Sequence, residues 1–327
     1  MMKTPISLII DDPAPRVLAY YAHIPGHTLK DGRAIPREVP NSFMEKFCDI
    51  IERYSIRGKF SVIPMPLGEG NILTGIPGID QKEVDEWLTM AKDRVSKLFS
   101  ICPEMLTHAE AVDLKTNTLL PMNEEEWSNA QTADTLTPYI ARALTMLKDA
   151  GLFPSGVTSP WSFGCKVESA YAESVAKAFF EVFKQKNSWY FLHCLGDKDG
   201  IKPWIAYEKD GLRTVSIPAT TDDMFWQTMN TTDTSDEYVS IIADQLISMD
   251  GKTGRIIDIL KSGGYPILLT HWQSLFSNGA GTGLRALCET AKRIEMHLSD
   301  TVQWTSSEEL MRMTLDHPAD YPKPAFL

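Results

Sequence analysis

Carboxylates and imidazoles recur in this sequence where short apolar segments end. Asp11 and Asp12 directly follow the apolar run 6–10, and His108, His193 and His271 stand immediately after three further apolar runs. Carboxylate and imidazole groups serve as general acids and bases, and both ligate zinc and harder divalent ions. The pattern predicts a hydrolytic or metal-binding site. The alternative is that each histidine is a hydrogen-bonded structural residue.

The adjacent carboxylates Asp11 and Asp12 must be stabilised by some partner. Like charges at this spacing repel unless a cation, a proton or hydrogen-bond donors relieve them. One carboxylate could ligate a metal ion while the other serves as a base. An Asp-Asp turn before Pro13, which simply ends a strand, is the other interpretation.

Short apolar runs alternate with longer segments of helical spacing along the whole chain, which is typical of an α/β fold. Most of the short runs are almost wholly apolar, as expected for strands covered on both faces. We expect strands at 6–10, 59–63, 105–107, 156–158, 189–192, 214–217, 266–270 and 302–304. We expect helices at 42–54, 82–99, 135–150, 167–186, 237–248, 283–298 and 306–313.

In a parallel barrel the residues that follow the strands all lie on one rim, where such folds place their active sites. Two connections, 13–40 and 114–132, are too long for simple barrel loops, and we expect them to cover this rim. No repeat or clear linker divides the sequence, so we expect one domain over 1–327. The aspartates and histidines named above would then share one pocket.

The bulk composition limits the classes of binding partner and the cellular setting that we expect. The chain has 327 residues and a formal net charge of −11, without a basic patch, which argues against nucleic acid and anionic membrane partners. No run of 18 apolar residues occurs, so we expect no membrane-spanning helix. The short apolar run near the start leads into Asp11 and Asp12, which argues against its being a signal peptide. The five cysteines are scattered and never form a Cys-x-x-Cys pair, which favours buried thiols and a reduced, cytoplasmic setting. The sequence gives no indication of the oligomeric state.

Four short motifs resemble those of the polysaccharide deacetylases, in the same order and at similar spacing over nearly the whole chain. The motifs lie at 9–12, 106–108, 158–161 and 268–271. The resemblance implies a distorted seven-stranded (β/α) barrel of the glycoside hydrolase/deacetylase type that binds a divalent metal such as zinc. It also implies removal of an acetyl group from a carbohydrate or a related small polar substrate.

Position by position, the resemblance implies Asp11 as general base and His271 as general acid. It implies Asp12 and His108 as metal ligands, with Trp161 offering an apolar face to a sugar ring. His193 and Asp223, at two further strand ends, are additional candidates for substrate binding.

The sequence departs from the family pattern at two positions. Val112 stands where the family has a second histidine ligand. The arginine that opens the third motif is also absent, so another residue must orient the base, and Arg37 is a candidate for this only by residue type. Four residues could replace the missing ligand: Glu110, Asp113, His23 and His27.

Two other functions therefore stay open. The first is a barrel that has lost its catalytic metal and binds a glycan or a partner. The second is a hydrolase of a glycosidic or amide bond in which Asp222 or Asp223 takes part.

Overall fold

A computed structural model describes residues 3–17, 32 and 36–327 of the chain. Its strands are β1 (Thr4–Asp11), β2 (Gly58–Val62), β3 (Phe99–Pro103), β4 (Glu110–Asp113), β5 (Thr118–Asn123), β6 (Gly156–Thr158), β7 (Asn187–Phe191), β8 (Trp204–Lys209), β9 (Leu212–Ser216), β10 (Ile267–His271) and β11 (Val302–Trp304). Its α-helices are α1 (Asn41–Arg53), α2 (Gln81–Asp93), α3 (Glu124–Ser128), α4 (Ala133–Asp149), α5 (Glu168–Phe183), α6 (Asp236–Leu246), α7 (Arg255–Lys261), α8 (Trp272–Phe276), α9 (Thr282–Leu298) and α10 (Ser307–Asp316). The predicted α/β alternation is confirmed.

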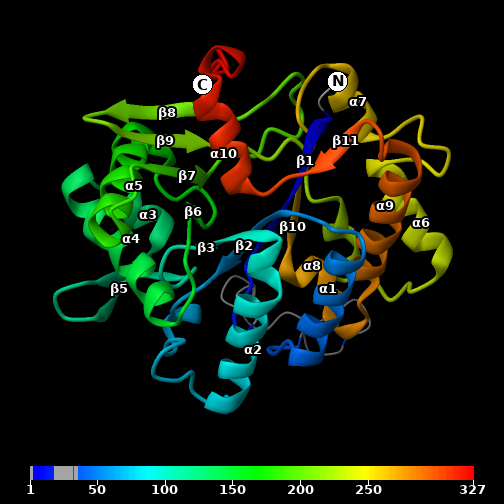
Figure 1. Cartoon of the computed structure of the whole chain (residues 1–327). Helices are drawn as coiled ribbons and strands as arrows, with labels where there is room; N and C mark the ends of the chain where they lie inside the picture. Colours follow the sequence, from blue (N-terminus) through cyan, green and yellow to red (C-terminus); the bar gives the residue numbers. More distant parts are fainter. Residues whose placement is uncertain (1–2, 18–31, 33–35) are drawn as a thin grey trace.

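Two sheets carry the core (Figure 1). In the first, β10, β1, β2 and β3 lie side by side and parallel, and β11 pairs with the start of β1. In the second, β6, β7 and β9 are parallel and β8 is antiparallel to β9. The register of β1 and β10 sets Asp11 opposite His271, so both residues lie at the carboxyl end of the first sheet.

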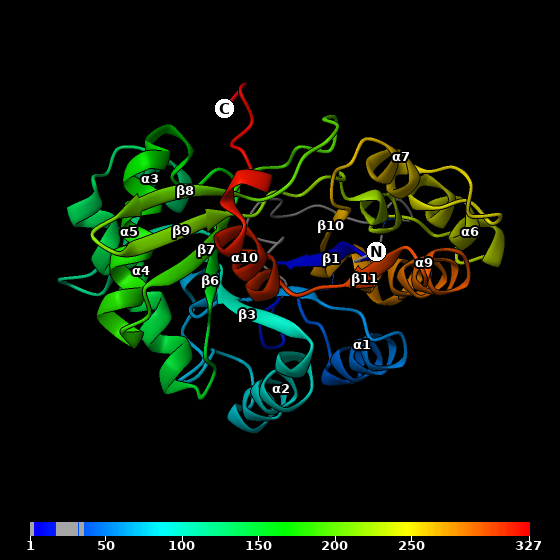
Figure 2. The same ribbon diagram turned by 45° about the horizontal axis from the view of Figure 1, so that its top comes forward.

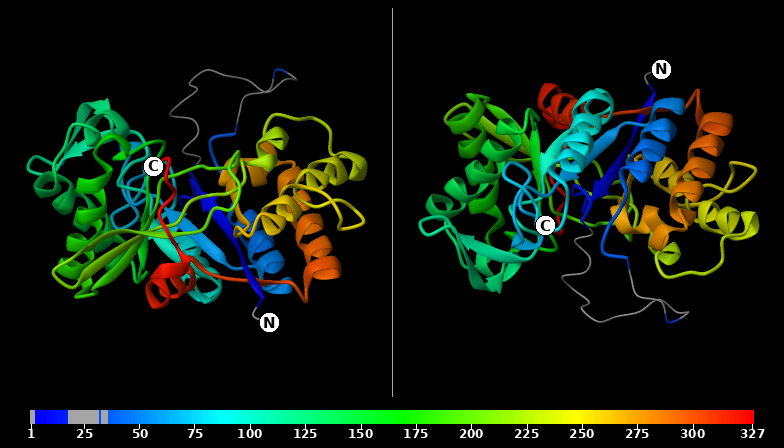
Figure 3. Two further views of the ribbon diagram at one scale, coloured as in Figure 1. Left: turned by 90° about the horizontal axis from the view of Figure 1, so that it is seen from above. Right: turned by 90° about the horizontal axis from the view of Figure 1, so that it is seen from below.

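Helices flank the strands on several sides. In Figure 2, α1 and α2 lie along one side of the first sheet, while α10 packs between the two sheets in contact with β3 and β7. Both views of Figure 3 put α4 and α5 on one side of β1 and α6 and α9 on the other. Because helices cover the sheet, every residue of β2 and β3 is buried.

The two sheets approach each other at both lateral edges. Next to β3, Glu104 forms an isolated parallel bridge with Thr158 at the end of β6. Beyond β9, the backbone N–H of Thr220 donates to the Ile267 carbonyl of β10 at 2.9 Å. The strand pairing itself leaves two open sheets, so the predicted closure into a barrel is not established by the hydrogen-bond ladders.

Some predicted elements were wrong. The predicted helix at 82–99 ends at Asp93. The apolar spacing continues past this point, but the residues that carry it form a 3₁₀ turn (Val95–Lys97) and the start of β3. The strand predicted at 105–107 is an irregular segment that follows the end of β3 at Pro103. The predicted loop 114–132 contains β5 and α3, and most of the predicted loop 13–40 lies outside the described residues.

Candidate metal and acid–base site

Asp11 and Asp12 end β1 and face different partners. Both are nearly inaccessible to solvent. Asp11 is the last residue of the strand, whereas Asp12 adopts a left-handed conformation with φ 70°, which aspartate tolerates better than most residues. This change of backbone direction turns the Asp12 side chain toward His108 and leaves Asp11 with Lys59. The predicted repulsion is therefore relieved by a separate cationic partner for each carboxylate.

Lys59 in β2 holds Asp11. Its Nζ is fully buried, forms an ion pair with the Asp11 carboxylate and donates to Ser61 Oγ at 2.7 Å. Burial raises the pKa of Asp11 to about 6, although the Lys59 charge opposes that rise. Asp11 is thus ionised at neutral pH while keeping an unusual affinity for a proton, as suits a general base.

Asp12, Glu104 and His108 form a compact cluster. Each offers one ligand atom, and these atoms lie within 4.8 Å of one another. His108 Nε2 is 2.9 Å from Asp12 Oδ1 and 3.4 Å from Glu104 Oε1, and the Asp12 backbone N–H donates to Glu104 Oε2 at 2.8 Å. Two carboxylates and an imidazole are a donor set that suits zinc and related divalent ions.

Charge within the cluster is balanced by the imidazole. Burial alone would lower the pKa of His108, but Asp12 and Glu104 raise it well above its usual value. Burial would likewise raise the pKa of Asp12, yet His108 holds it well below its usual range. Since a proton on His108 stabilises the paired carboxylates, a divalent cation bound there would take the place of that proton.

His271, the last residue of β10, is held by Asp223. Its Nδ1 lies 2.8 Å from Asp223 Oδ2, which also accepts the Ser274 hydroxyl at 2.7 Å. Burial would lower the pKa of His271, but Asp223 and the nearby aspartates raise it to about 9. The ring is therefore protonated at neutral pH, and the Nδ1 contact leaves Nε2 as the nitrogen that can donate to a substrate.

Tryptophans lie beside both site histidines. The ring centroid of Trp161 is 4.8 Å from that of His108, and Trp226 meets His271 edge to face at 5.0 Å. Both indoles are 38% exposed, so they present apolar surface at the site. Trp161 has φ 48°, a left-handed conformation that is energetically costly for a bulky residue.

The residues predicted to bind substrate, His193 and Asp223, both form close polar contacts with other side chains of this chain. His193 Nε2 lies 2.7 Å from Glu168 Oε1, and its ring packs against Trp204 with centroids 5.4 Å apart. Asp223 accepts the Phe225 N–H through Oδ1 and supports His271 through Oδ2. The contacts of Asp223 make it a residue that orients His271.

Comparison with solved structures identifies the fold. One protein assigned as a polysaccharide deacetylase from Mycobacterium smegmatis aligns with a TM-score of 0.50 at 14% identity, covering 84% of this chain and 78% of its own. Another, assigned as a glycoside hydrolase/deacetylase from Parabacteroides distasonis, aligns with a TM-score of 0.53 at 8% identity, covering 96% of this chain and 72% of its own. This chain has a deacetylase-type fold. No protein-family model matches the sequence, and no curated protein matches it.

Glu104, which the sequence did not suggest as a ligand, is the residue that joins Asp12 and His108 in the cluster. Val112, at the position of the family's second histidine, is buried in β4 among apolar side chains. Of the predicted replacements, Glu110 is exposed and Asp113 caps a turn by accepting the Lys115 N–H at 2.8 Å. His23 and His27 lie outside the described residues. Glu104 precedes His108 by four residues, whereas the family histidine follows it by four.

Two further site residues were not foreseen. Lys59 pairs with Asp11, whereas Arg37, the candidate by residue type, pairs with Glu69 at the surface. Gln273 in α8 donates its amide N–H to Asp12 Oδ2 and is almost fully buried. The sequence held one signal for Lys59, namely a lysine in a segment that was predicted to be a strand covered on both faces.

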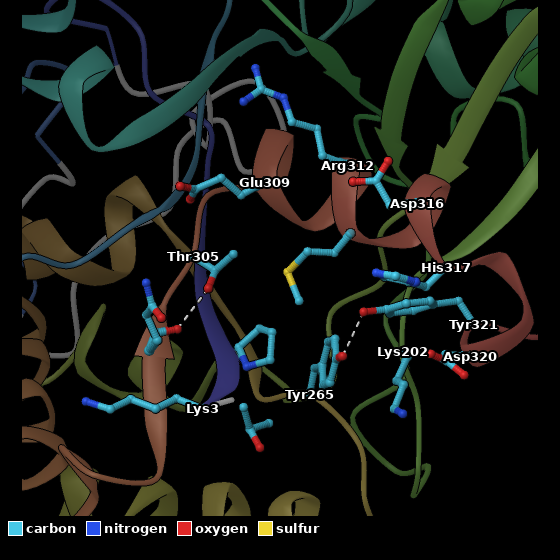
Figure 4. Close-up of a pocket in the computed structure, with 14 residues that line it drawn as sticks. Lys3, Lys202, Tyr265, Thr305, Glu309, Arg312, Asp316, His317, Asp320 and Tyr321 are labelled. Carbon is cyan, nitrogen blue, oxygen red and sulfur yellow. Dashed lines mark hydrogen bonds between the residues drawn. The ribbon is translucent and has the colours of Figure 1, made fainter. Parts of the chain in front are cut away.

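A separate cavity lies at the opposite end of β1. It has a volume of about 740 Å³ and is lined by Thr4, Gln303 and Arg312 among others (Figure 4). Thr4 starts β1 and Asp11 ends it, and an eight-residue strand spans roughly 23 Å. The cavity therefore does not contain the acid–base cluster.

The remaining sequence expectations concern cysteines and membranes. All five cysteines are free, with Cys48 and Cys102 buried but Cys165 and Cys194 exposed, so the prediction of buried thiols holds for only part of the set. Among the described residues, no helix combines the length and the apolar character needed to cross a membrane.

Proposed function

We propose that this protein is a metal-dependent hydrolase that removes acetyl groups from a carbohydrate or a related small polar substrate. One observation carries the proposal: Asp12, Glu104 and His108, all buried, bring ligand atoms within 4.8 Å of one another beside a potential acid and a potential base. The deacetylase-type fold supports the choice of reaction, although fold alone is a weak guide to chemistry.

Asp12, Glu104 and His108 would hold a divalent cation, zinc or one of similar preference. The donor set fits, because the cluster is nearly closed to solvent and the imidazole lies within ion-pair distance of both carboxylates. A cation bound there would acidify a water molecule and polarise the acetyl carbonyl. Gln273 would fix the Asp12 carboxylate by donating to its Oδ2.

Asp11 and His271 would move the protons. Asp11, ionised above about pH 6, would accept a proton from the attacking water. His271, protonated below about pH 9, would donate a proton from Nε2 to the departing amine or alcohol. Asp223 would act through His271, by fixing its ring and supporting its charge.

A sugar ring is the substrate that the tryptophans favour. Trp161 would wall the pocket next to the metal ligands and offer an apolar face. His193 stays a proposed substrate contact, with its ring orientation fixed by Glu168. The net charge of −11 continues to favour a neutral or small polar partner over nucleic acid.

We also propose that seven of the parallel strands form one distorted barrel in a single domain. The order β10, β1, β2, β3, β6, β7, β9 would close through the Glu104–Thr158 bridge on one side and the Thr220–Ile267 hydrogen bond on the other. Such closure would bring the ends of β1, β3 and β10 to one rim.

Metal affinity and acetate release test the proposal together. Zn²⁺ binding to the purified chain is measured by competition with a chromophoric chelator, and acetate release is followed on acetylated oligosaccharides. We expect Asp12→Ala, Glu104→Gln and His108→Ala to lose both metal and activity. Glu110→Gln, an exposed carboxylate of the same local segment, is the matched control and should retain both. Unchanged metal occupancy in all three cluster variants would remove the assignment.

A metal-free glycan-binding protein is the second candidate. Its support is the salt-bridged cluster itself, because a protonated His108 already pairs with both carboxylates. Glycan binding that survives exhaustive chelation, in a protein that releases no acetate, would favour this function over the first.

A further inference from the structure

Glu124 is a fully buried carboxylate whose polar contacts all come from donors. Its Oε1 accepts the backbone N–H groups of Leu106 at 2.9 Å and Thr107 at 3.1 Å, and the Tyr139 hydroxyl at 2.7 Å. Its Oε2 accepts the backbone N–H of His108 at 2.9 Å. The carboxylate therefore holds three consecutive peptide groups, the last of which belongs to a proposed metal ligand.

A hairpin returns the chain so that Glu124 reaches this turn. After His108 the chain forms β4 and β5, which pair antiparallel with Glu110 opposite Asn123. Glu124 begins α3 directly after β5, and its own N–H donates to the Ala109 carbonyl at 2.8 Å. The pairing fixes the carboxylate beneath the turn that carries His108.

The turn needs such support because its backbone is unusual. Met105 and His108 both have positive φ values, 41° and 53°, in a region that side chains other than glycine adopt at a cost. This conformation lets Glu104 and His108, four residues apart and outside any helix, both reach Asp12. Without the Glu124 carboxylate as acceptor, the buried N–H groups of Leu106, Thr107 and His108 would lose these hydrogen bonds.

We propose that Glu124 is a positioning residue for the metal site, fixing His108 through the hydrogen bond between the His108 N–H and Glu124 Oε2. The inference rests on the metal-binding function proposed above. Outer groups that orient a metal ligand commonly change metal affinity by about 10- to 100-fold when they are altered. Glu124 touches neither metal nor substrate and would act only through the ligand.

Glu124→Gln tests this inference with little change in size. Because three donors converge on Oε1, the amide oxygen should stay on that side and the amide NH₂ should face the His108 N–H. Two donors would then oppose each other at the ligand itself. We expect Zn²⁺ affinity to fall about 10- to 100-fold and the visible spectrum of the Co²⁺-loaded protein to change.

Tyr139→Phe is the matched control, because it removes a donor from the same carboxylate but leaves the His108 contact. It also strands the Val112 N–H, which donates to the Tyr139 hydroxyl at 3.2 Å, so it should lower the melting temperature as well. We expect its Zn²⁺ affinity and Co²⁺ spectrum to stay close to those of the wild type. A purely structural role for Glu124 would instead make both variants lose metal in proportion to their loss of stability.

Hydrogen exchange of the metal-free proteins tests the contact between Glu124 and residues 106–108 independently of metal binding. The amides of residues 106–108 should be protected in the wild type and exchange faster in Glu124→Gln. Wild-type Zn²⁺ binding together with an unchanged affinity in Glu124→Gln would overturn the inference alone. A wild type that binds no Zn²⁺ would overturn the proposed function and, with it, the positioning role, whatever the exchange result.

Discussion

Lys59→Met probes how the charge of Lys59 affects the pKa of Asp11, the proposed base. Lys59 is fully buried and its ammonium group pairs with the Asp11 carboxylate. Burial alone lowers the pKa of Lys59, but Asp11 raises it above the usual value, so Lys59 is a cation in the folded protein. Methionine has a similar length and fits apolar surroundings, so the substitution removes the charge without leaving a large cavity.

The size of the effect follows from the Asp11 pKa. Its value of about 6 already includes the opposing influence of Lys59. An opposite charge in contact lowers a carboxyl pKa by about 1 to 3, so its loss should raise the pKa of Asp11 to roughly 8. The ionised fraction at pH 7 would then fall from about 0.9 to about 0.1, a roughly tenfold loss of active base.

Two assays report this change. Carboxyl ¹³C titration by NMR gives the pKa of Asp11 directly, and acetate release across pH at equal metal loading gives the rising limb of kcat/KM. Both midpoints should move up by about 2, and activity should recover at high pH. Ser61→Ala is the control, because it removes the 3.3 Å hydroxyl contact to Asp11 and the 2.7 Å acceptor of Lys59 but keeps the Lys59 charge, so it should move them far less. An unmoved Asp11 midpoint in Lys59→Met would show that the Lys59 charge does not hold down the pKa of Asp11.

The remaining predictions concern the acid, the aromatic wall and the third ligand. Asp223→Asn should lower the pKa of His271 from about 9, so that the falling limb of the pH–rate profile moves to lower pH; an unchanged limb would exclude His271 as the acid. Trp161→Ala should raise KM about three- to tenfold with little change in kcat, in line with the loss of ~1 kcal/mol of apolar contact, and a change confined to kcat would contradict a substrate-binding wall. Glu104→Asp should bind Zn²⁺ more weakly than the wild type but better than Glu104→Gln, because the shortened carboxylate keeps its charge; isothermal titration calorimetry ranks the three, and equal affinities would exclude Glu104 as a ligand.

Much of the site could be predicted from strand exits. Apolar runs covered on both faces gave the positions of β1 and β10, and the polar residues after them, Asp11, Asp12 and His271, follow as rim residues. That step needs only local pattern and the rule that parallel strands share a carboxyl edge.

Glu104 and Lys59 could not be found in this way. The spacing of Val95 and Leu98 continues that of α2, so the predicted helix ran into β3 and Glu104 fell before the predicted strand instead of at its exit. Lys59 lies within β2, where a lysine is expected to point to solvent, and only the tertiary contact with Asp11 accounts for its burial. Glu124 depends on a hairpin that returns the chain to residue 108, which no local pattern signals.

Anomalous diffraction from crystals grown with Zn²⁺ would show directly whether Asp12, Glu104 and His108 bind a metal ion. We expect one peak about 2.0–2.2 Å from carboxylate oxygens of Asp12 and Glu104 and from an imidazole nitrogen of His108. A Zn²⁺ peak elsewhere, or none with His108 still paired to Asp12 and Glu104 at saturating Zn²⁺, would contradict this expectation.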